Sequence, residues 1–300
     1  MKPGLANKIF KRMRGLLSEE EGMRTKHGIA FALDILAANG VAHMNITDDF
    51  GNDILISTKD KVISTSLIRD GEYSLEIMRT LVERMQAAGL APGDFLFVNA
   101  GANIGTTIIN AKNCGFVQML AIEPDPSNFK LLTHNTGQLS DAAVTLKNVA
   151  VGREEGELIL YRHPTNHGMH SMIPPEGVDL NESAASDDTA QLRVAVKPLS
   201  SLIDEGKPFV LFGDVEGYEL PLLQGGITRI KENCQAMCLE LTPVRYDAET
   251  AQDLTKIFGS FSDSYFNVET GESLPVSDLS SALRKKGAGQ FDAIFLRQIT

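Results

Sequence analysis

Four side chains able to exchange protons lie in two short stretches of the sequence. His167 and His170 are three residues apart, and because histidine titrates near neutral pH, either could act as a general base. Asp214 and Glu216 follow an apolar run at 209–213. A carboxylate there could orient a reacting hydroxyl or an imidazole, hold a divalent cation, or cap the next helix. We predict a catalytic site that contains His167, His170, Asp214 and Glu216. The alternative for the two histidines is that they only shape an exposed turn.

The same histidines could instead bind a metal ion. His163, His167 and His170 have the spacing i, i+4 and i+7, which would place three imidazoles on one face of a helix. Pro164 and Gly168 argue against a helix at this place. No metal site is therefore predicted.

A glycine-containing turn follows an apolar run farther upstream. Residues 95–105 read FLFVNAGANIG, which predicts a buried strand, a turn and the start of a helix. Gly101 has no Cβ, so the backbone can turn tightly and approach a ligand. Aligned on Gly101, the dinucleotide fingerprint would need glycine where Asn99 and Ile104 stand. The turn therefore favours a ligand with an amino-acid end and a nucleoside end.

Glu123 ends a second apolar run at 116–122. It follows the glycine turn by about 20 residues, which is the position at which an acidic residue binds ribose hydroxyls. The alternative is an ordinary strand–helix–strand unit with a tight turn and a surface glutamate. The turn and the glutamate together favour a binding site.

Apolar runs alternate with helical patterns along the chain. Strands are predicted at 95–99, 116–122, 143–149, 157–162, 192–197, 209–215, 236–241, 265–268 and 291–297, and helices at 27–38, 74–89, 127–137 and 248–260. A further helix after Asp214 is expected to end at Gly225-Gly226. The alternation predicts an α/β fold whose mostly parallel sheet is covered on both faces. Its strand ends carry Asn99, Glu123, Asn148 and Asp214.

The patterns divide the chain into two parts. Residues 1–92 are expected to form an N-terminal α+β extension, in which DILIST and VISTSLI (53–58 and 62–68) form a hairpin. Residues 93–300 are expected to form the ligand-binding domain, with an inserted loop at 163–190. We expect a site loop at 163–175 and an acidic tip at 176–190, because a structureless stretch this long is usually functional or disordered.

Composition excludes several classes of protein. The 300 residues are 43% hydrophobic and 22% charged, with a net charge of −11, which argues against a nucleic-acid binder. Cys114, Cys234 and Cys238 form no disulfide framework and fit a reducing cytoplasm. No apolar run is long enough for a membrane span, and no signal peptide is evident. The basic amphipathic pattern at 5–17 predicts a docking helix or a frayed end, with membrane contact as the alternative.

Six segments together resemble the FkbM family of S-adenosylmethionine-dependent methyltransferases. Between about residues 71 and 240 the chain reads PGDFLFVNAGANIG, AIEPDPSNFKLLTHN, NVAVG, NHGMHSM, VKPLSSLI and DVEGYELPLLQGG in this order. The resemblance implies a class I methyltransferase (Rossmann-like) fold with a seven-stranded sheet. It also implies S-adenosyl-L-methionine as the cofactor and, usually, methyl transfer to an oxygen.

The resemblance also assigns the cofactor contacts. The turn would hold the methionine part, Glu123 the ribose, and residues 148–150 would flank the adenine. The full set that it implies is Asn99, Ala100, Gly101, Ala102, Asn103, Ile104, Gly105, Glu123, Pro124, Asn148, Val149, Ala150 and Asp214. Asn99 stands where the family commonly has aspartate, and its carbonyl oxygen can still accept a hydrogen bond from the cofactor's ammonium.

The expected reaction is O-methylation of a hydroxyl on a sugar, a glycan or another small-molecule natural product, in the cytoplasm. One alternative is an S-adenosylmethionine-binding module without catalysis. A second is a nicotinamide-dependent oxidoreductase, against which the missing glycines count.

Overall fold

The computed structural model describes residues 26–163, 165–174, 191–285 and 287–298. The amphipathic pattern at 5–17 and the acidic tip at 176–190 lie outside these residues. In the described part of the chain, no helix has the length and apolar character needed to cross a membrane. Cys114, Cys234 and Cys238 are free thiols, as predicted.

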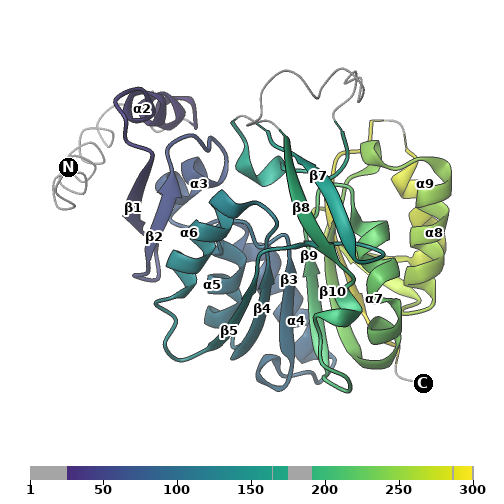
Figure 1. Ribbon diagram of the computed structural model, residues 1–300. Helices are drawn as coiled ribbons and strands as arrows, with labels where there is room; N and C mark the ends of the chain where they lie inside the picture. Colours follow the sequence, from purple (N-terminus) through teal and green to yellow (C-terminus); the bar gives the residue numbers. More distant parts are fainter. Residues whose placement is uncertain (1–25, 164, 175–190, 286, 299–300) are drawn as a thin grey trace.

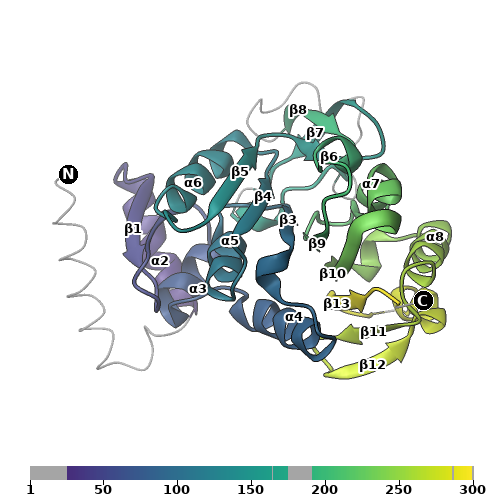
Figure 2. The ribbon, with the colours of Figure 1, turned by 90° about the horizontal axis from the view of Figure 1, so that it is seen from below.

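An eight-stranded sheet forms the centre of the molecule (Figures 1 and 2). Its strands, in spatial order, are β12 (Glu272–Pro275), β11 (Ser264–Asn267), β13 (Phe291–Leu296), β10 (Cys234–Leu241), β9 (Phe209–Gly213), β3 (Leu96–Ala100), β4 (Gln118–Ile122) and β5 (Ala143–Lys147). The strands from β10 to β5 are parallel, whereas β13, β11 and β12 pair antiparallel. The mostly parallel sheet is as predicted. The count of seven strands is wrong, because the short edge strand β12 adds an eighth.

Helices cover both faces of this sheet, as Figure 2 shows. On one face lie α4 (Leu75–Ala87), α5 (Thr106–Asn113) and α6 (Pro126–Thr136), and on the other α7 (Glu219–Asn233), α8 (Ala248–Gly259) and α9 (Leu279–Leu283). Each face has its own apolar core, and alternate residues of one strand belong to different cores. Phe97 of β3 packs on the first face and Val98 on the second, as the period of two along a strand requires.

The order of the strands creates a switch point between β3 and β9. From β3 the chain adds β4 and β5 on one side, and then crosses to β9 and adds β10 on the other. Loops that leave the carboxyl ends of β3 and β9 therefore diverge and leave a crevice, where ligands bind in open α/β sheets.

The crossover from β5 to β9 contains a separate three-stranded sheet. Its strands are β6 (Ala150–Val151), β8 (Gln191–Lys197) and β7 (Gly156–Tyr161), in that spatial order. The strand predicted at 143–149 is therefore divided, since it ends at Lys147 and the chain re-enters a different sheet at Ala150. The strands predicted at 157–162 and 192–197 exist, but they lie outside the main sheet.

The hairpin predicted at 53–58 and 62–68 is wrong. The two-stranded sheet pairs β1 (His43–Thr47) with β2 (Asp53–Ser57), and residues 63–70 form α3 (Ile63–Asp70), which packs on α2 (Lys26–Ala38). Asp60 explains the difference, because its Oδ1 accepts hydrogen bonds from the backbone N–H groups of Val62 and Ser64. This capping stabilises a helix start despite the β-branched residues that follow. The predicted boundary at residue 92 stays a prediction.

The helix end predicted at Gly225-Gly226 is also wrong, since α7 continues to Asn233. Both glycines are buried inside the helix. A Cβ on Gly225 would lie 1.9 Å from the carbonyl oxygen of Gly152. The glycine is therefore needed because the helix approaches the backbone of the small sheet closely.

This close approach predicts the sign of a mutational effect. Alanine inside a helix is normally more stable than glycine by about 1 kcal/mol, yet we expect Gly225→Ala to destabilise the protein by about 1–3 kcal/mol through overpacking. Urea denaturation measures the change. Gly156→Ala is the control, because nothing lies within 4 Å of its added Cβ. Equal or higher stability of Gly225→Ala would show that the helix is not fixed against Gly152.

Candidate functional site

A cavity opens at the carboxyl ends of β3, β4, β9 and β10, at the switch point of the sheet. It is lined by Gly101 and Asn103 after β3, Glu123 and Pro124 after β4, residues 149–151, residues 166–170 with Met172, residues 214–216, and Glu240 of β10. Gly101 and Asp214, which are more than 100 residues apart in the sequence, thus meet at this edge of the sheet. The remaining lining includes Val62, Ile63, Tyr73, Thr106, Thr107, Ile122, Asn128 and Gln290.

The turn after β3 is fixed by its neighbours on both sides. The backbone N–H groups of Gly101 and Ala102 donate to the carbonyl oxygen of Ile122. Gly101 has a φ of +83°, and a Cβ there would lie 1.8 Å from the carbonyl oxygen of Asp214. Gly101 is therefore required for the close approach of the β3 and β9 ends, whether or not a ligand is bound.

Glu123 lies at the floor of this cavity and is only 4% exposed. Its Oε2 accepts a hydrogen bond of 2.9 Å from the backbone N–H of Asn103, and its Oε1 accepts one of 2.9 Å from that of Asp125. Burial raises the pKa of Glu123 to about 7, although these hydrogen bonds oppose the shift. Each carboxylate oxygen keeps a second lone pair for a ligand hydroxyl.

Two asparagines hold the loop that closes the cavity. Asn103 and Asn128 both donate from Nδ2 to the carbonyl oxygen of His167, over 3.0 and 3.2 Å. Their Oδ1 atoms are buried without a hydrogen-bond partner in the described residues. Because both residues line the cavity, these two oxygens are acceptors available to a ligand.

The loop is also tied to the N-terminal segment. Asp60 Oδ2 accepts the backbone N–H of His167 over 3.0 Å, and the N–H of Lys61 donates to Thr165. On the other side, Ser171 Oγ donates to the carbonyl oxygen of Glu216. The part of the predicted site loop that the structure describes therefore lies over the strand ends.

The two candidate histidines differ in the hydrogen bonding of their rings. Both line the cavity, with ring centroids 5.4 Å apart. His170 Nδ1 accepts the backbone N–H of His163, whereas no hydrogen bond to the imidazole of His167 occurs within the described part of the chain. Burial lowers the pKa of both histidines, that of His170 to about 4. Burial thus favours the neutral form of both rings, and of the two only His167 has a ring nitrogen that accepts no hydrogen bond from the described residues.

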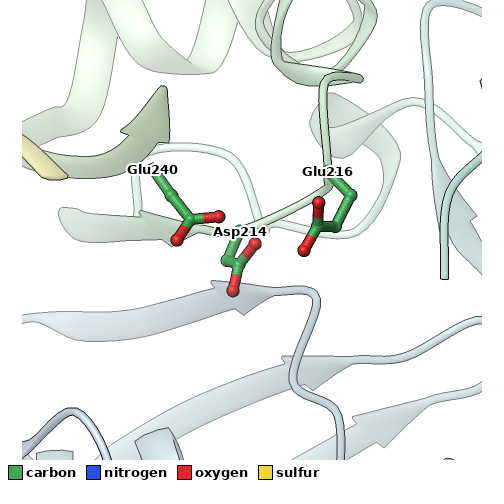
Figure 3. A group of neighbouring side chains, drawn as sticks. All are labelled: Asp214, Glu216 and Glu240. Atoms are coloured by element: carbon green, nitrogen blue, oxygen red, sulfur yellow. The ribbon is translucent and has the colours of Figure 1, made fainter. Parts of the chain in front are cut away.

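Asp214 and Glu216 form one acidic group with Glu240, as Figure 3 shows. Burial is the main reason why the pKa values of all three carboxyls are raised, with additional repulsion from neighbouring acids. The pKa rises to about 7 for Glu216 and to about 9 for Glu240. Glu216 also has a φ of +53° and is followed by Gly217 at +93°.

The structure brings most of the predicted residues to one cavity, but not all. Ten line it, namely Gly101, Asn103, Glu123, Pro124, Val149, Ala150, His167, His170, Asp214 and Glu216. Six do not, namely Asn99, Ala100, Ala102, Ile104, Gly105 and Asn148, and their cofactor contacts stay predictions. Asn99 is fully buried in β3, and neither polar atom of its side chain has a partner among the described residues. Asn148 instead supports the site, because its Nδ2 donates to the carbonyl oxygens of Glu123 and Pro124.

Sequence patterns gave no role to two residues that build the site. Asn128 belongs to a helix pattern and Asp60 to a predicted hairpin turn, so neither carried a signal. Glu240 lies at the end of an apolar run, and this position made it an alternative candidate for the base.

Residues 99–266 match the model of the methyltransferase FkbM domain. The chain belongs to this family. The match and the mostly parallel eight-stranded sheet identify a class I methyltransferase fold. No curated protein matches the sequence.

Solved methyltransferase structures resemble this FkbM domain only distantly. The delta-N METTL16 MTase domain is 12% identical, with a TM-score of 0.46, and the match covers 94% of this chain and 100% of that one. Magnesium protoporphyrin IX methyltransferase (ChlM) from Synechocystis PCC 6803 with bound SAM is 13% identical, with a TM-score of 0.41 and coverages of 79% and 85%. Ribosomal protein L11 methylase from Lactobacillus delbrueckii subsp. bulgaricus is 11% identical, with a TM-score of 0.37 and coverages of 74% and 78%. The family assignment of this chain rests on the domain match.

The position of Glu123 in this FkbM domain leads to a binding prediction. We expect Glu123→Ala to weaken S-adenosylmethionine by about 2 kcal/mol or more, because ligand hydroxyls lose a charged acceptor and two backbone N–H groups are left without one. Glu123→Gln keeps one acceptor oxygen and should lose less. Titration calorimetry gives both affinities. Equal affinity of the wild-type protein for the cofactor and its 2′-deoxy analogue would contradict a ribose contact.

Proposed function

We propose that this protein transfers a methyl group from S-adenosyl-L-methionine to a hydroxyl of a sugar, a glycan or another small-molecule natural product. The observation that carries the proposal is the convergence of Glu123, the turn at 101–103, His167 and the acidic group on one cavity. When bound, the cofactor supplies an activated methyl group on a sulfonium. The protein then has to align the acceptor and remove its proton.

The polar groups of the cavity fit such a cofactor. Glu123 offers buried lone pairs to ribose hydroxyls, and Asn103 and Asn128 offer two unpartnered oxygens. The walls carry Asp214, Glu216 and Glu240. The carboxyl oxygens of this wall can accept hydrogen bonds from the cofactor's ammonium. The net charge of −11 supports an acceptor that is not a nucleic acid.

His167 is the residue that we assign to proton removal. Its backbone is held at both ends, by Asp60 through the N–H and by Asn103 and Asn128 through the carbonyl. Its ring is neutral and accepts no hydrogen bond in the described residues, so a lone pair is available. His170 lacks this property, because Nδ1 is occupied by the N–H of His163 and the neutral ring carries its proton on Nε2.

Release of S-adenosylhomocysteine, measured with a panel of sugars, glycans and phenolic or aliphatic alcohols, tests the function. We expect release that depends on a hydroxyl acceptor, and no thermal shift with NAD or NADP. Cofactor binding without release for any acceptor class would favour the non-catalytic module. Release with amines but not with alcohols would contradict O-methylation.

Single substitutions test the base. We expect His167→Ala to lower turnover by roughly 10²- to 10⁴-fold, while cofactor affinity measured by calorimetry changes little. His170→Ala is the matched control and should lose less than tenfold. Wild-type turnover in His167→Ala would move the base to Asp214 or Glu216.

The pH dependence of kcat/KM gives an independent check. A base must be deprotonated to act, so activity is present above its pKa and is lost as the pH falls through it. Burial lowers the pKa of His167 below its ordinary value of 6.5. Glu123 and Glu216 have pKa values of about 7 and Glu240 of about 9, so the limb that belongs to His167 is the one that lies below about pH 6.5 and is missing from the residual activity of His167→Ala. The same limb in both proteins would contradict the assignment.

A further inference from the structure

Three carboxylates meet at one wall of the cavity. Asp214 follows β9, Glu216 comes two residues later, and Glu240 lies in the neighbouring strand β10. One carboxylate oxygen of each lies within 4.8 Å of those of the other two. In Figure 3 the three side chains point toward a common space, and all three line the cavity.

The three carboxyls have no basic partner among the described residues. None of the three carboxylates forms an ion pair with a lysine, arginine or histidine in the part of the chain that the structure describes. Arg245 is near enough to lower the pKa of Glu216, but burial and other acids outweigh it. Asp292 lies directly opposite Glu240 in the register of β10 and β13 and adds a further buried carboxyl.

One oxygen of Asp214 lacks the kind of hydrogen bond that the carboxylates of Glu123 and Glu219 receive. Glu123 has a backbone N–H donor on each oxygen, and Glu219 accepts from Tyr246 and from the N–H of Gly217. Asp214 Oδ1 is buried and has no donor in the described residues. Glu123 and Glu219 thus have donors within the protein, whereas this oxygen of Asp214 has none among the described residues. An oxygen that receives no hydrogen bond is available as a ligand for a cation.

Glu240 is oriented from outside the group. Gln290 Nε2 donates to Glu240 Oε1 over 2.9 Å. A hydrogen bond of this kind fixes the orientation of a carboxylate that binds a metal.

We propose that Asp214, Glu216 and Glu240 bind a hard divalent cation of the Mg²⁺ or Mn²⁺ type. All three ligands are carboxylate oxygens, which suit such ions rather than zinc or copper. In magnesium sites the metal–oxygen distance is about 2.1 Å, so opposite ligands lie about 4.2 Å apart. The 4.8 Å limit therefore allows all three oxygens to bind one ion after small side-chain movements.

The ion would face the cavity with its remaining coordination positions. Water or an acceptor oxygen can occupy them, and a bound metal lowers the pKa of such an oxygen. This role rests on the proposed function, whereas cation binding itself does not. An ammonium group, from the cofactor or from an amine acceptor, is the competing cation for the same carboxylates.

Metal binding is tested on the full-length protein after treatment with EDTA, without cofactor or acceptor. Mn²⁺ is titrated and free Mn²⁺ is followed by electron paramagnetic resonance, and Mg²⁺ and Mn²⁺ are compared in thermal melting. We expect one bound Mn²⁺ per chain and a higher melting temperature with either ion. Glu240→Gln should weaken Mn²⁺ by at least tenfold, whereas Glu83→Gln, an exposed control in α4, should not.

Melting without metal shows whether Glu240→Gln folds. The variant replaces a carboxyl whose pKa is raised to about 9 by an uncharged amide of similar shape, so without metal it should melt near the wild-type temperature. Failure of the wild-type protein to bind Mn²⁺ more tightly than Glu240→Gln would overturn the proposal. Stabilisation by S-adenosylmethionine but by neither metal would do the same and would assign the carboxylates to an ammonium group. In that result the proposed function still stands. Binding of a metal without any binding of S-adenosylmethionine would instead support the cation site and contradict the proposed function.

Discussion

The carbonyl oxygen of Asp214 occupies the place that a side chain at residue 101 would take. A Cβ there would lie 1.8 Å away, and the N–H of Asp214 donates to the carbonyl oxygen of Ala100. This contact brings the ends of β3 and β9 together at the switch point of the sheet. The glycine turn then faces Glu123 on one side and the acidic group on the other. The surroundings of Glu123 and the acidic group thus share one backbone contact, which depends on the absence of a single Cβ.

The sequence was sufficient to predict which residues lie together at the strand ends. It was not sufficient to predict which residues hold the loop over them. Asn103, Glu123 and Asp214 could be placed near one another because parallel strands present their carboxyl ends at the same edge. Asn128 and Asp60 could not, because their function is to hydrogen-bond the backbone of His167, and a backbone group leaves no pattern in the sequence. Glu240 depends on the register of β10 with β9 and β13, which a single strand does not encode.

Local signals also failed where tertiary contacts opposed them. The alternating β-branched residues of VISTSLI favour a strand, but the capping carboxylate of Asp60 and the burial of Ile63 and Leu67 stabilise a helix. A pair of glycines usually ends a helix, yet at Gly225-Gly226 it allows α7 to pass close to the small sheet. In the first case a neighbouring carboxylate and burial decided the structure, and in the second a backbone segment distant in sequence did.

Asp60 makes one set of hydrogen bonds within its own segment and one hydrogen bond to a segment distant in the sequence. Its Oδ1 caps α3, which requires only neighbouring residues, while its Oδ2 binds the N–H of His167, 107 residues farther along the chain. Because Oδ1 is hydrogen-bonded to the backbone at residues 62 and 64, the Asp60 side chain is already held in place within its own segment, and the contact with His167 orders little more of it. Helix α3 thus anchors the loop that carries His167. Exchange of the N-terminal segment would remove one of the three side chains that hold the backbone of His167, the other two being Asn103 and Asn128.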